Sequence, residues 1–271
     1  MIRTLTHDDF ESLYAAFLAA FSDYVVPFAL TREQLAEMIT RRGWVPEVSV
    51  GAFDGEAMVA FTLNGIEGDR AYDTGTGVVP SHRRRGLARE LMERSFELLW
   101  ERCSSYVLEV IDSNTRAFEL YEALGFEVTR GLQCWSYEPQ SRVSASRSGD
   151  GGLSSTPSGV GTLRLHADVE PSWQNSNGSI ARAKQPHVTI GDERGYAILF
   201  PGNGDLAQLA VRRDSRRQGI GTRLLQSAAS LAGKPLRIMN VDESDRGIAA
   251  FLEHNGAAKT VRQLEMLRVL S

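Results

Sequence analysis

Two short turns rich in arginine and glycine hold the residues best suited to chemistry. Each turn follows an apolar run and opens an amphipathic helix, where backbone N–H groups and the helix dipole attract anions. Small residues there let the backbone approach a phosphate closely. The plainer alternative is an ordinary loop-to-helix junction with a solvated basic face. The first turn comprises Arg83, Arg84, Arg85, Gly86, Leu87 and Ala88, and the second carries Arg216, Gly219 and Gly221.

The elements that must position these turns are predicted to occur twice. Gly219 lies 133 residues after Gly86, and Gly256 lies 131 residues after Gly125, so the copies differ by a net deletion of two residues. Apolar alternation and turn residues predict strands and helices in the same order around both turns. The first copy has strands at 2–6, 48–53, 57–64, 70–79, 106–111 and 126–137, and helices at 8–20, after Thr31, at 86–102 and at 115–124. The second has strands at 163–166, 187–191, 195–200, 205–211, 236–241 and 257–270, and helices at 218–232 and 246–254.

Residues 139–161 differ from the rest of the chain, because Ser, Gly and Pro dominate them and no aromatic residue occurs. Such a segment can bury little surface and is expected to be a flexible linker. We therefore expect one domain at 1–138 and a second, shortened domain at 162–271. Only residues 167–186 separate the first two strands of the second copy, about half the length available in the first.

Composition excludes several classes of protein. The chain has 271 residues, a formal net charge of −4 and two cysteines, which argues against a nucleic-acid binder and a disulfide scaffold. We expect no metal site, no membrane span and a cytoplasmic location. The phosphate loop of nucleotide hydrolases, the dinucleotide fingerprint and the serine elbow of hydrolases are all missing from the sequence.

The two turns resemble the pyrophosphate turn of the GNAT superfamily of acetyl-coenzyme-A-dependent acyltransferases. The preceding strand, which ends at Val78 and Val79, and the later run with Asn114, Tyr121 and Gly125 are similar to further signatures of that superfamily. The resemblance covers the chain except for residues 139–161. It implies an α/β (α+β) fold in tandem, each copy a mixed, mostly antiparallel twisted sheet flanked by helices. It further implies that acetyl-coenzyme A binds the turns and Asn114, with its pantetheine arm along Val78 and Val79.

The resemblance assigns Tyr121 as the general acid that protonates the leaving thiolate, whereas an ordinary core tyrosine is the alternative. Asp73 and Glu109 lie on strands near the expected cleft, and either could take the amine proton directly or through water. Solvated strand carboxylates would explain both equally well. Asp23 and Tyr24 follow the first helix and are candidates for contact with the acceptor, although turn capping also explains Asp23.

Counting outward from the second turn places Leu252 where the first copy has Tyr121. Since leucine cannot donate a proton, we expect the first domain to be catalytic and the second to be degenerate. The leading hypothesis is acetyl transfer from acetyl-coenzyme A to a primary amine, a small molecule or a peptide, by direct attack in a ternary complex. The alternative is a coenzyme-A-binding regulatory or scaffold protein without turnover. A homodimer is left open.

Overall fold

The computed structural model describes residues 1–23, 30–138, 154–156 and 168–270. The chain forms two compact units, Met1–Thr129 with Leu264–Ser271, and Arg130–Gln263. Strand β6 (Glu127–Tyr137) begins in the first unit and ends in the second, and β12 (Ala258–Val269) does the reverse. The first unit therefore takes its last strand from the C-terminal end of the chain, a division that differs from the boundary expected at residues 139–161.

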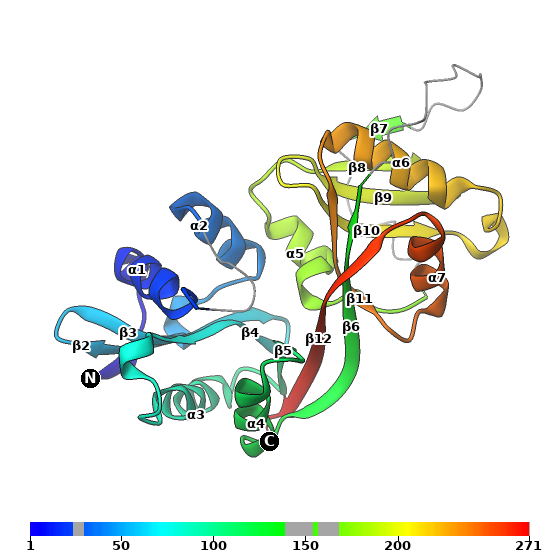
Figure 1. Ribbon diagram of the computed structural model, residues 1–271. Coiled ribbons are helices and arrows are strands. Elements are labelled where there is room, and N and C mark those ends of the chain that lie inside the picture. Colours follow the sequence, from blue (N-terminus) through cyan, green and yellow to red (C-terminus); the bar gives the residue numbers. More distant parts are fainter. Residues whose placement is uncertain (24–29, 139–153, 157–167, 271) are drawn as a thin grey trace. The chain divides into compact units, whose positions relative to one another are not determined.

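The first unit is a mixed sheet with helices on both faces (Figure 1). Its strands lie in the order β1-β2-β3-β4-β5, followed by the end of β12. Neighbours from β1 to β4 pair antiparallel, whereas β4 and β5 pair parallel. The elements are β1 (Ile2–Thr4), α1 (Phe10–Ala20), α2 (Arg32–Arg41), β2 (Val50–Asp54), β3 (Ala57–Glu67), β4 (Arg70–Val78), α3 (Leu87–Leu99), β5 (Ser105–Ile111) and α4 (Thr115–Ala123), with 3-10 turns at His7–Asp9, Pro46–Val48 and Pro80–His82.

Alternating residues of β3 supply two cores in this unit. Phe61 packs with α1 on one face, where its ring stacks on Phe17 at 5.8 Å between centroids. Ala60 faces the opposite way and packs with Leu91 of α3. Period-two alternation thus gives each face of the sheet its own helices.

The second unit repeats the arrangement with fewer elements. Its strands lie in the order β6-β11-β10-β9-β8-β7 after the beginning of β12. Within the expected linker, β7 pairs antiparallel with β8, and the strand expected at 163–166 lies outside the described residues. The elements are β7 (Ser154–Thr156), α5 (Asn177–Arg182), β8 (Val188–Asp192), β9 (Gly195–Phe200), β10 (Asp205–Val211), α6 (Ile220–Ala232), β11 (Leu236–Asp242) and α7 (Arg246–His254), with 3-10 turns at Trp173–Asn175 and Arg213–Ser215.

Strand β9 separates the two cores of the second unit. Ala197 and Leu199 pack with α6, whereas Tyr196, Ile198 and Phe200 pack with Ile180 of α5. Among the described residues of the second unit that precede β8, α5 is the one α-helix. Both units therefore have the predicted mixed, mostly antiparallel sheet flanked by helices, and the predicted fold class is confirmed.

Candidate active site

The turn before α3 is built to expose backbone N–H groups. Arg84 has a φ of 64° and Gly86 a φ of 82°, so both adopt the left-handed conformation. The first bond of the helix runs from the N–H of Glu90 to the carbonyl of Gly86 at 3.1 Å, which leaves the N–H groups of residues 87–89 without a partner inside the helix. A Cβ built on Gly86 would meet nothing within 4 Å. The turn is therefore open to an anion.

The guanidinium of Arg83 is bonded within the protein. It donates to the carbonyl of Val78 at 3.2 Å, to that of Ala20 at 2.9 Å, and to both carboxylate oxygens of Asp23 at 2.6 and 2.7 Å. Arg83 in turn lowers the pKa of Asp23. Two residues expected to contact different substrates thus contact each other, and they join the end of β4 to the end of α1. Tyr24 lies outside the described residues.

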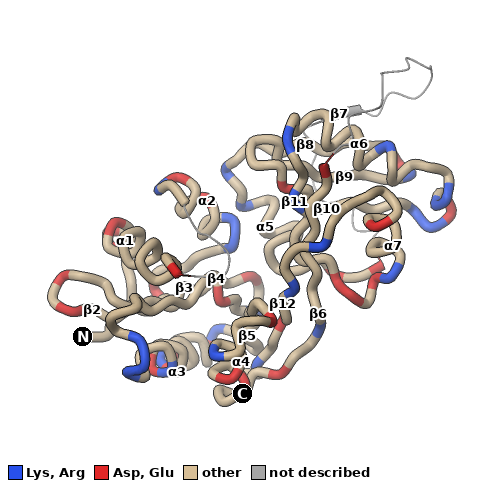
Figure 2. Tube along the Cα trace, in the orientation of Figure 1, with Lys and Arg blue, Asp and Glu red and all other residues tan. Residues whose placement is uncertain are grey.

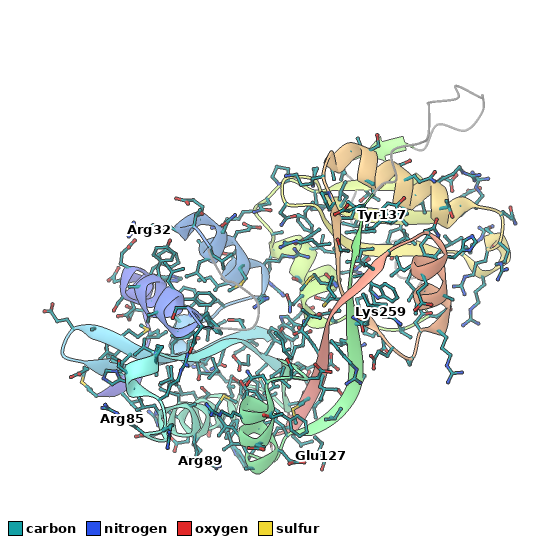
Figure 3. The ribbon with its side chains drawn as sticks, viewed as in Figure 1. Arg32, Arg85, Arg89, Glu127, Tyr137 and Lys259 are labelled. Atoms are coloured by element: carbon teal, nitrogen blue, oxygen red, sulfur yellow. The ribbon has the colours of Figure 1, made fainter. Side chains whose placement is uncertain are left out.

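The other arginines of this turn reach solvent. Arg84 and Arg85 are exposed, and Arg85 donates to the carbonyl of Ser81 at 3.1 Å. Figure 2 shows basic residues gathered at the start of α3, and Figure 3 marks Arg85 on the α3 side of the sheet. Leu87 and Ala88, the first two helical residues, are half-buried. The positive charge open to an anion therefore comes from the second and third arginines rather than the first.

Strands β4 and β5 separate next to this turn. Their parallel register covers only three pairs and ends at Tyr72 and Val107, although β4 continues to Val78. The carbonyl of Val78 accepts from Arg83, and the N–H of Val79 donates to the carbonyl of Val59 at 2.9 Å. The carbonyl of Val79 accepts from the N–H of His82 at 2.9 Å, so what these two carbonyls can offer an extended ligand is a second lone pair.

Asp73 lies where β4 bulges at the beginning of this separation. Leu63 and Asn64 of β3 pair with Gly75 and Asp73, so one extra residue is inserted in β4. The Asp73 carboxylate accepts from the N–H of Gly75 and from the hydroxyl of Thr76, both at 2.8 Å. Burial raises its pKa to about 6, and both hydrogen bonds act in the opposite direction.

Glu109 joins the same region from β5. Its Oε2 accepts from the hydroxyl of Tyr72 at 3.0 Å. Burial, and next the charge of Glu109, raise the pKa of Tyr72 well above its ordinary value, whereas Arg42 lowers it. Arg42 also donates to the carbonyl of Thr74 at 2.7 Å, inside the bulge. Glu109, Arg42 and Asp73 therefore all lie in the electrostatic surroundings of the Tyr72 phenol.

Tyr121 lies on α4 and packs in a core cluster with Tyr106 and Leu108 of β5. Asn114 caps this helix, and its side chain accepts from the N–H of Ala117 at 3.3 Å. Tyr121 is 8% exposed and lies edge-on to Phe126 at 5.8 Å between centroids. Burial raises the pKa of Tyr106, and the charges of Asp73 and then Tyr121 raise it further, which places both groups in the electrostatic surroundings of that one phenol.

The second unit reproduces the first turn in detail. Arg217 has a φ of 62° and Gly219 a φ of 74°. Arg216 donates to the carbonyl of Val211 at 2.9 Å and to the carboxylate of Asp168 at 2.6 Å, as Arg83 does to Val78 and Asp23. We call each of these ion pairs, Arg83 with Asp23 and Arg216 with Asp168, a turn latch.

Gly221 has a steric reason of its own. A Cβ at this position would lie 3.1 Å from the ring of Phe251 on α7. The glycine thus allows two helices of the second unit to pack closely. Approach of a phosphate is not needed to explain it.

The three candidate catalytic positions of the first unit have no chemical counterpart in the second. The bulge of β10 places Leu206 where β4 has Asp73. Asp205 of β10 pairs with Arg237 of β11 as Tyr72 pairs with Val107, which matches Met239 with Glu109. Leu252 matches Tyr121, because the carbonyl of each accepts, at 3.0 Å, from the first residue after the closing glycine. The second unit therefore repeats the turn without an acid or a carboxylate base at these positions.

Among the described residues, no three His, Cys, Asp or Glu side chains form a group that could hold a metal ion. In the same part of the chain, no helix is both long and apolar enough to cross a membrane. Cys103 and Cys134 are buried thiols outside any disulfide.

An open turn with two left-handed residues, placed before a helix beside a mixed sheet, occurs in both units and defines a duplicated α/β fold. The model of the acetyltransferase (GNAT) family matches residues 10–126 and 168–257. The chain belongs to this family, whose members use acetyl-coenzyme A and act on amine acceptors. The predicted family, tandem arrangement and enzyme class are thus confirmed.

Solved structures show the same fold along the whole chain. A GCN5-related N-acetyltransferase from Sphaerobacter thermophilus has a TM-score of 0.74 and 16% identity, covering 100% of this chain and 95% of its own. A tandem GNAT protein from the clavulanic acid biosynthesis pathway has a TM-score of 0.68 and 17% identity, covering 100% and 98%. No curated protein matches the sequence.

Sequence reasoning missed three residues of these sites. Arg42 gave no signal, because it ends an ordinary amphipathic helix and reaches the bulge only in the fold. Tyr72 is adjacent to Asp73. Side chains alternate along a strand, and this alternation places Tyr72 on the same face of the sheet as Glu109, which could have identified it as a site residue. Asp168 follows the expected linker and could have been found by seeking an acidic partner for Arg216.

Proposed function

We propose that the first unit transfers an acetyl group from acetyl-coenzyme A to a primary amine by direct attack, and that the second unit does not catalyse this reaction. The observation that supports this most is that Asp73 and Tyr121 both lie in the electrostatic surroundings of Tyr106, near the point where β4 and β5 part. Glu109 is bonded to Tyr72, next to Asp73 in β4. The second unit has Leu206, Met239 and Leu252 at the matching positions.

Acetyl-coenzyme A supplies an activated thioester. The N–H groups of residues 87–89, with Arg84 and Arg85, suit its pyrophosphate, because a bare helix N-terminus with adjacent cations favours phosphate. We propose that the backbone at Val78 and Val79 and the side chain of Asn114 complete the binding site. We assign to Arg83 the role of holding the turn, since four of its five N–H donors are already used within the protein.

An amine acceptor must lose a proton before it attacks. A carboxylate whose pKa is about 6 is mostly ionised at neutral pH and can accept that proton through water, which favours Asp73 as the base. Glu109 is engaged by Tyr72 and serves as the second candidate. Tyr121 is the group we assign to protonate the leaving thiolate. With Asp23 held in the turn latch, the negative charge that attracts the acceptor comes from Asp73 and Glu109.

The test is release of thiol from acetyl-coenzyme A by the full chain with a panel of primary amines and peptides. We expect Tyr121→Phe to lower kcat by about 100-fold or more, in the range of general acid catalysis. Leu252→Met, the matched change in the second unit, should leave kcat unaltered. An equal loss of kcat in Tyr121→Phe and Leu252→Met would contradict the assignment of catalysis to the first unit alone. If acetyl-coenzyme A binds but no amine releases thiol, the scaffold hypothesis replaces this one.

We place the reaction in the cytoplasm, consistent with two buried thiols.

A further inference from the structure

The C-terminal end of α2 is seated on β3, next to the strand that carries Asp73. The N–H of Val45 donates to the carbonyl of Asn64 at 2.8 Å, and Trp44 forms an antiparallel bridge with Gly65. A Cβ built on Gly65 would overlap the carbonyl oxygen of Arg42, the residue that caps α2. Glycine is therefore required at this position of β3 for the end of α2 to approach the sheet so closely.

The side chain of Arg42 reaches from this anchor to β4. Its Nη1 donates to the carbonyl of Thr74 at 2.7 Å. Thr74 is the extra residue of the bulge, because Asp73 and Gly75 pair with consecutive residues of β3. Thr74 is also 1% exposed, and a hydrogen bond from a charged donor is among the stronger ones in proteins. Arg42 thus holds the conformation of the bulge that carries the Asp73 carboxylate.

The charge of Arg42 also acts on Asp73. Titratable groups around this carboxylate come from several elements, namely Tyr72 of β4, Tyr106 and Glu109 of β5, Tyr121 of α4, and Arg42. The neighbours from β3 and α3 are uncharged, namely Thr62 and Met92 beside Thr76. Of these described groups, Arg42 alone is a cation. Its charge lowers the pKa of Asp73, against the burial that raises this pKa to about 6.

We propose that Arg42 is a positioning residue for the general base, which clamps the bulge of β4 so that the Asp73 carboxylate is presented to the acceptor amine. This role rests on the proposed function, in which Asp73 accepts the proton of the amine. Arg42 acts through the backbone of Thr74 and through its charge, and it does not touch the substrate. An arginine with a structural role alone would support the fold without setting the pH at which Asp73 ionises.

The experiment is NMR titration of the Asp73 side-chain carboxyl in the full chain, with the signal assigned by Asp73→Asn, together with the pH dependence of kcat/KM. We expect Arg42→Met to move the Asp73 titration to higher pH, so kcat/KM should fall at least about threefold more at pH 6 than at pH 8. Arg42→Lys keeps the charge and a donor for the Thr74 carbonyl, and should recover part of both effects. Arg70→Met, at an exposed position of the same strand, is the matched control and should change neither.

Gly65→Ala provides a second variant that alters no charge. It should displace the end of α2 and move the Asp73 titration in the same direction as Arg42→Met, with circular dichroism to verify folding. If Gly65→Ala does not fold, the comparison of Arg42→Met with Arg42→Lys decides alone.

The outcomes separate this role from the proposed function. An Asp73 titration that stays in place in Arg42→Met would overturn the role of Arg42, and so would a loss of kcat/KM by the same factor at every pH. Either result leaves the proposed function standing if Asp73→Asn lowers kcat/KM. An unaltered kcat/KM in Asp73→Asn would instead refute Asp73 as the base, and with it the role of Arg42, even where the titration moves.

Discussion

Replacing Asp73 by Asn should make the protein more stable and less active at neutral pH. The carboxyl group is buried, and desolvation is the largest influence on its pKa. An asparagine fits the same contacts. Its oxygen can accept from the N–H of Gly75, and the Thr76 hydroxyl can accept from the new amide while donating to Thr62 Oγ1, now 3.1 Å away. The substitution removes the buried charge and leaves the hydrogen bonds possible.

The magnitude follows from the shift of the pKa. The value rises from 3.8 to about 6, and each unit corresponds to about 1.4 kcal/mol, which gives roughly 3 kcal/mol. Between these two values the native state binds more protons than the unfolded chain, so the contribution of Asp73 to stability falls as pH rises. It is fully present below about pH 4 and is lost as pH passes through about 6. The amide of the variant does not titrate, so the advantage of Asp73→Asn should grow by about 3 kcal/mol between pH 3.5 and pH 8.

The assay is urea denaturation of both proteins at several pH values. Glu56→Gln, at the exposed tip of the β2–β3 hairpin, is the matched control and should show no such trend. A difference between Asp73→Asn and the parent that stays constant within about 0.5 kcal/mol across this range would refute the reasoning on burial. If Asp73 is also the base, kcat/KM should fall by about 10²–10⁴-fold, and the acid limb near pH 6 should disappear.

Four further perturbations follow from the two turns and the site. Tyr121→Phe should lower single-turnover thiol release by about 100-fold at unchanged Tm, and an unaltered rate would exclude the acid role. Arg83→Lys cannot keep the bidentate contact with Asp23, so thermal unfolding should occur at lower temperature, whereas Arg84→Lys at an exposed position should match the parent. Gly86→Ala should lose roughly 1–2 kcal/mol of stability because of its positive φ and should weaken acetyl-coenzyme A binding. Gly219→Ala should lose similar stability without loss of turnover, and a fall in kcat would show that the second turn takes part.

Local patterns predicted much of this fold. The spacing of glycines around the two turns identified a duplication, and both turns adopt the same pair of left-handed residues. Asn114 caps α4 as expected, and Gly125 ends it with a φ of 82°, as Gly256 ends α7. The match of Tyr121 with Leu252, made by counting, has the same backbone bonding in both units. These features depend on residues close in sequence, and their conformational preferences are strong.

Contacts between distant residues could not be predicted in this way. Asp23 and Arg83 are 60 positions apart and form an ion pair, whereas sequence reasoning gave them separate roles. Strands β6 and β12 each run from one unit into the other, and this depends on the strands with which they pair. Local sequence patterns carry no information about that pairing. Arg42 reaches the bulge of β4 for the same reason. The contacts that sequence reasoning missed are those between residues that only the tertiary fold brings together.

The two turn latches show which part of the arginine–glycine motif concerns chemistry. Arg83 and Arg216 make the same contacts, to the carbonyl that ends a strand and to an aspartate from the preceding segment. The second unit has its latch although it lacks an acid or a carboxylate base at the matching catalytic positions. The first arginine of the motif is therefore required to build the turn, whether or not the unit is catalytic. A phosphate-type turn alone thus indicates the fold, and the inference of catalysis depends on the carboxylates and the phenol beside the splayed strands.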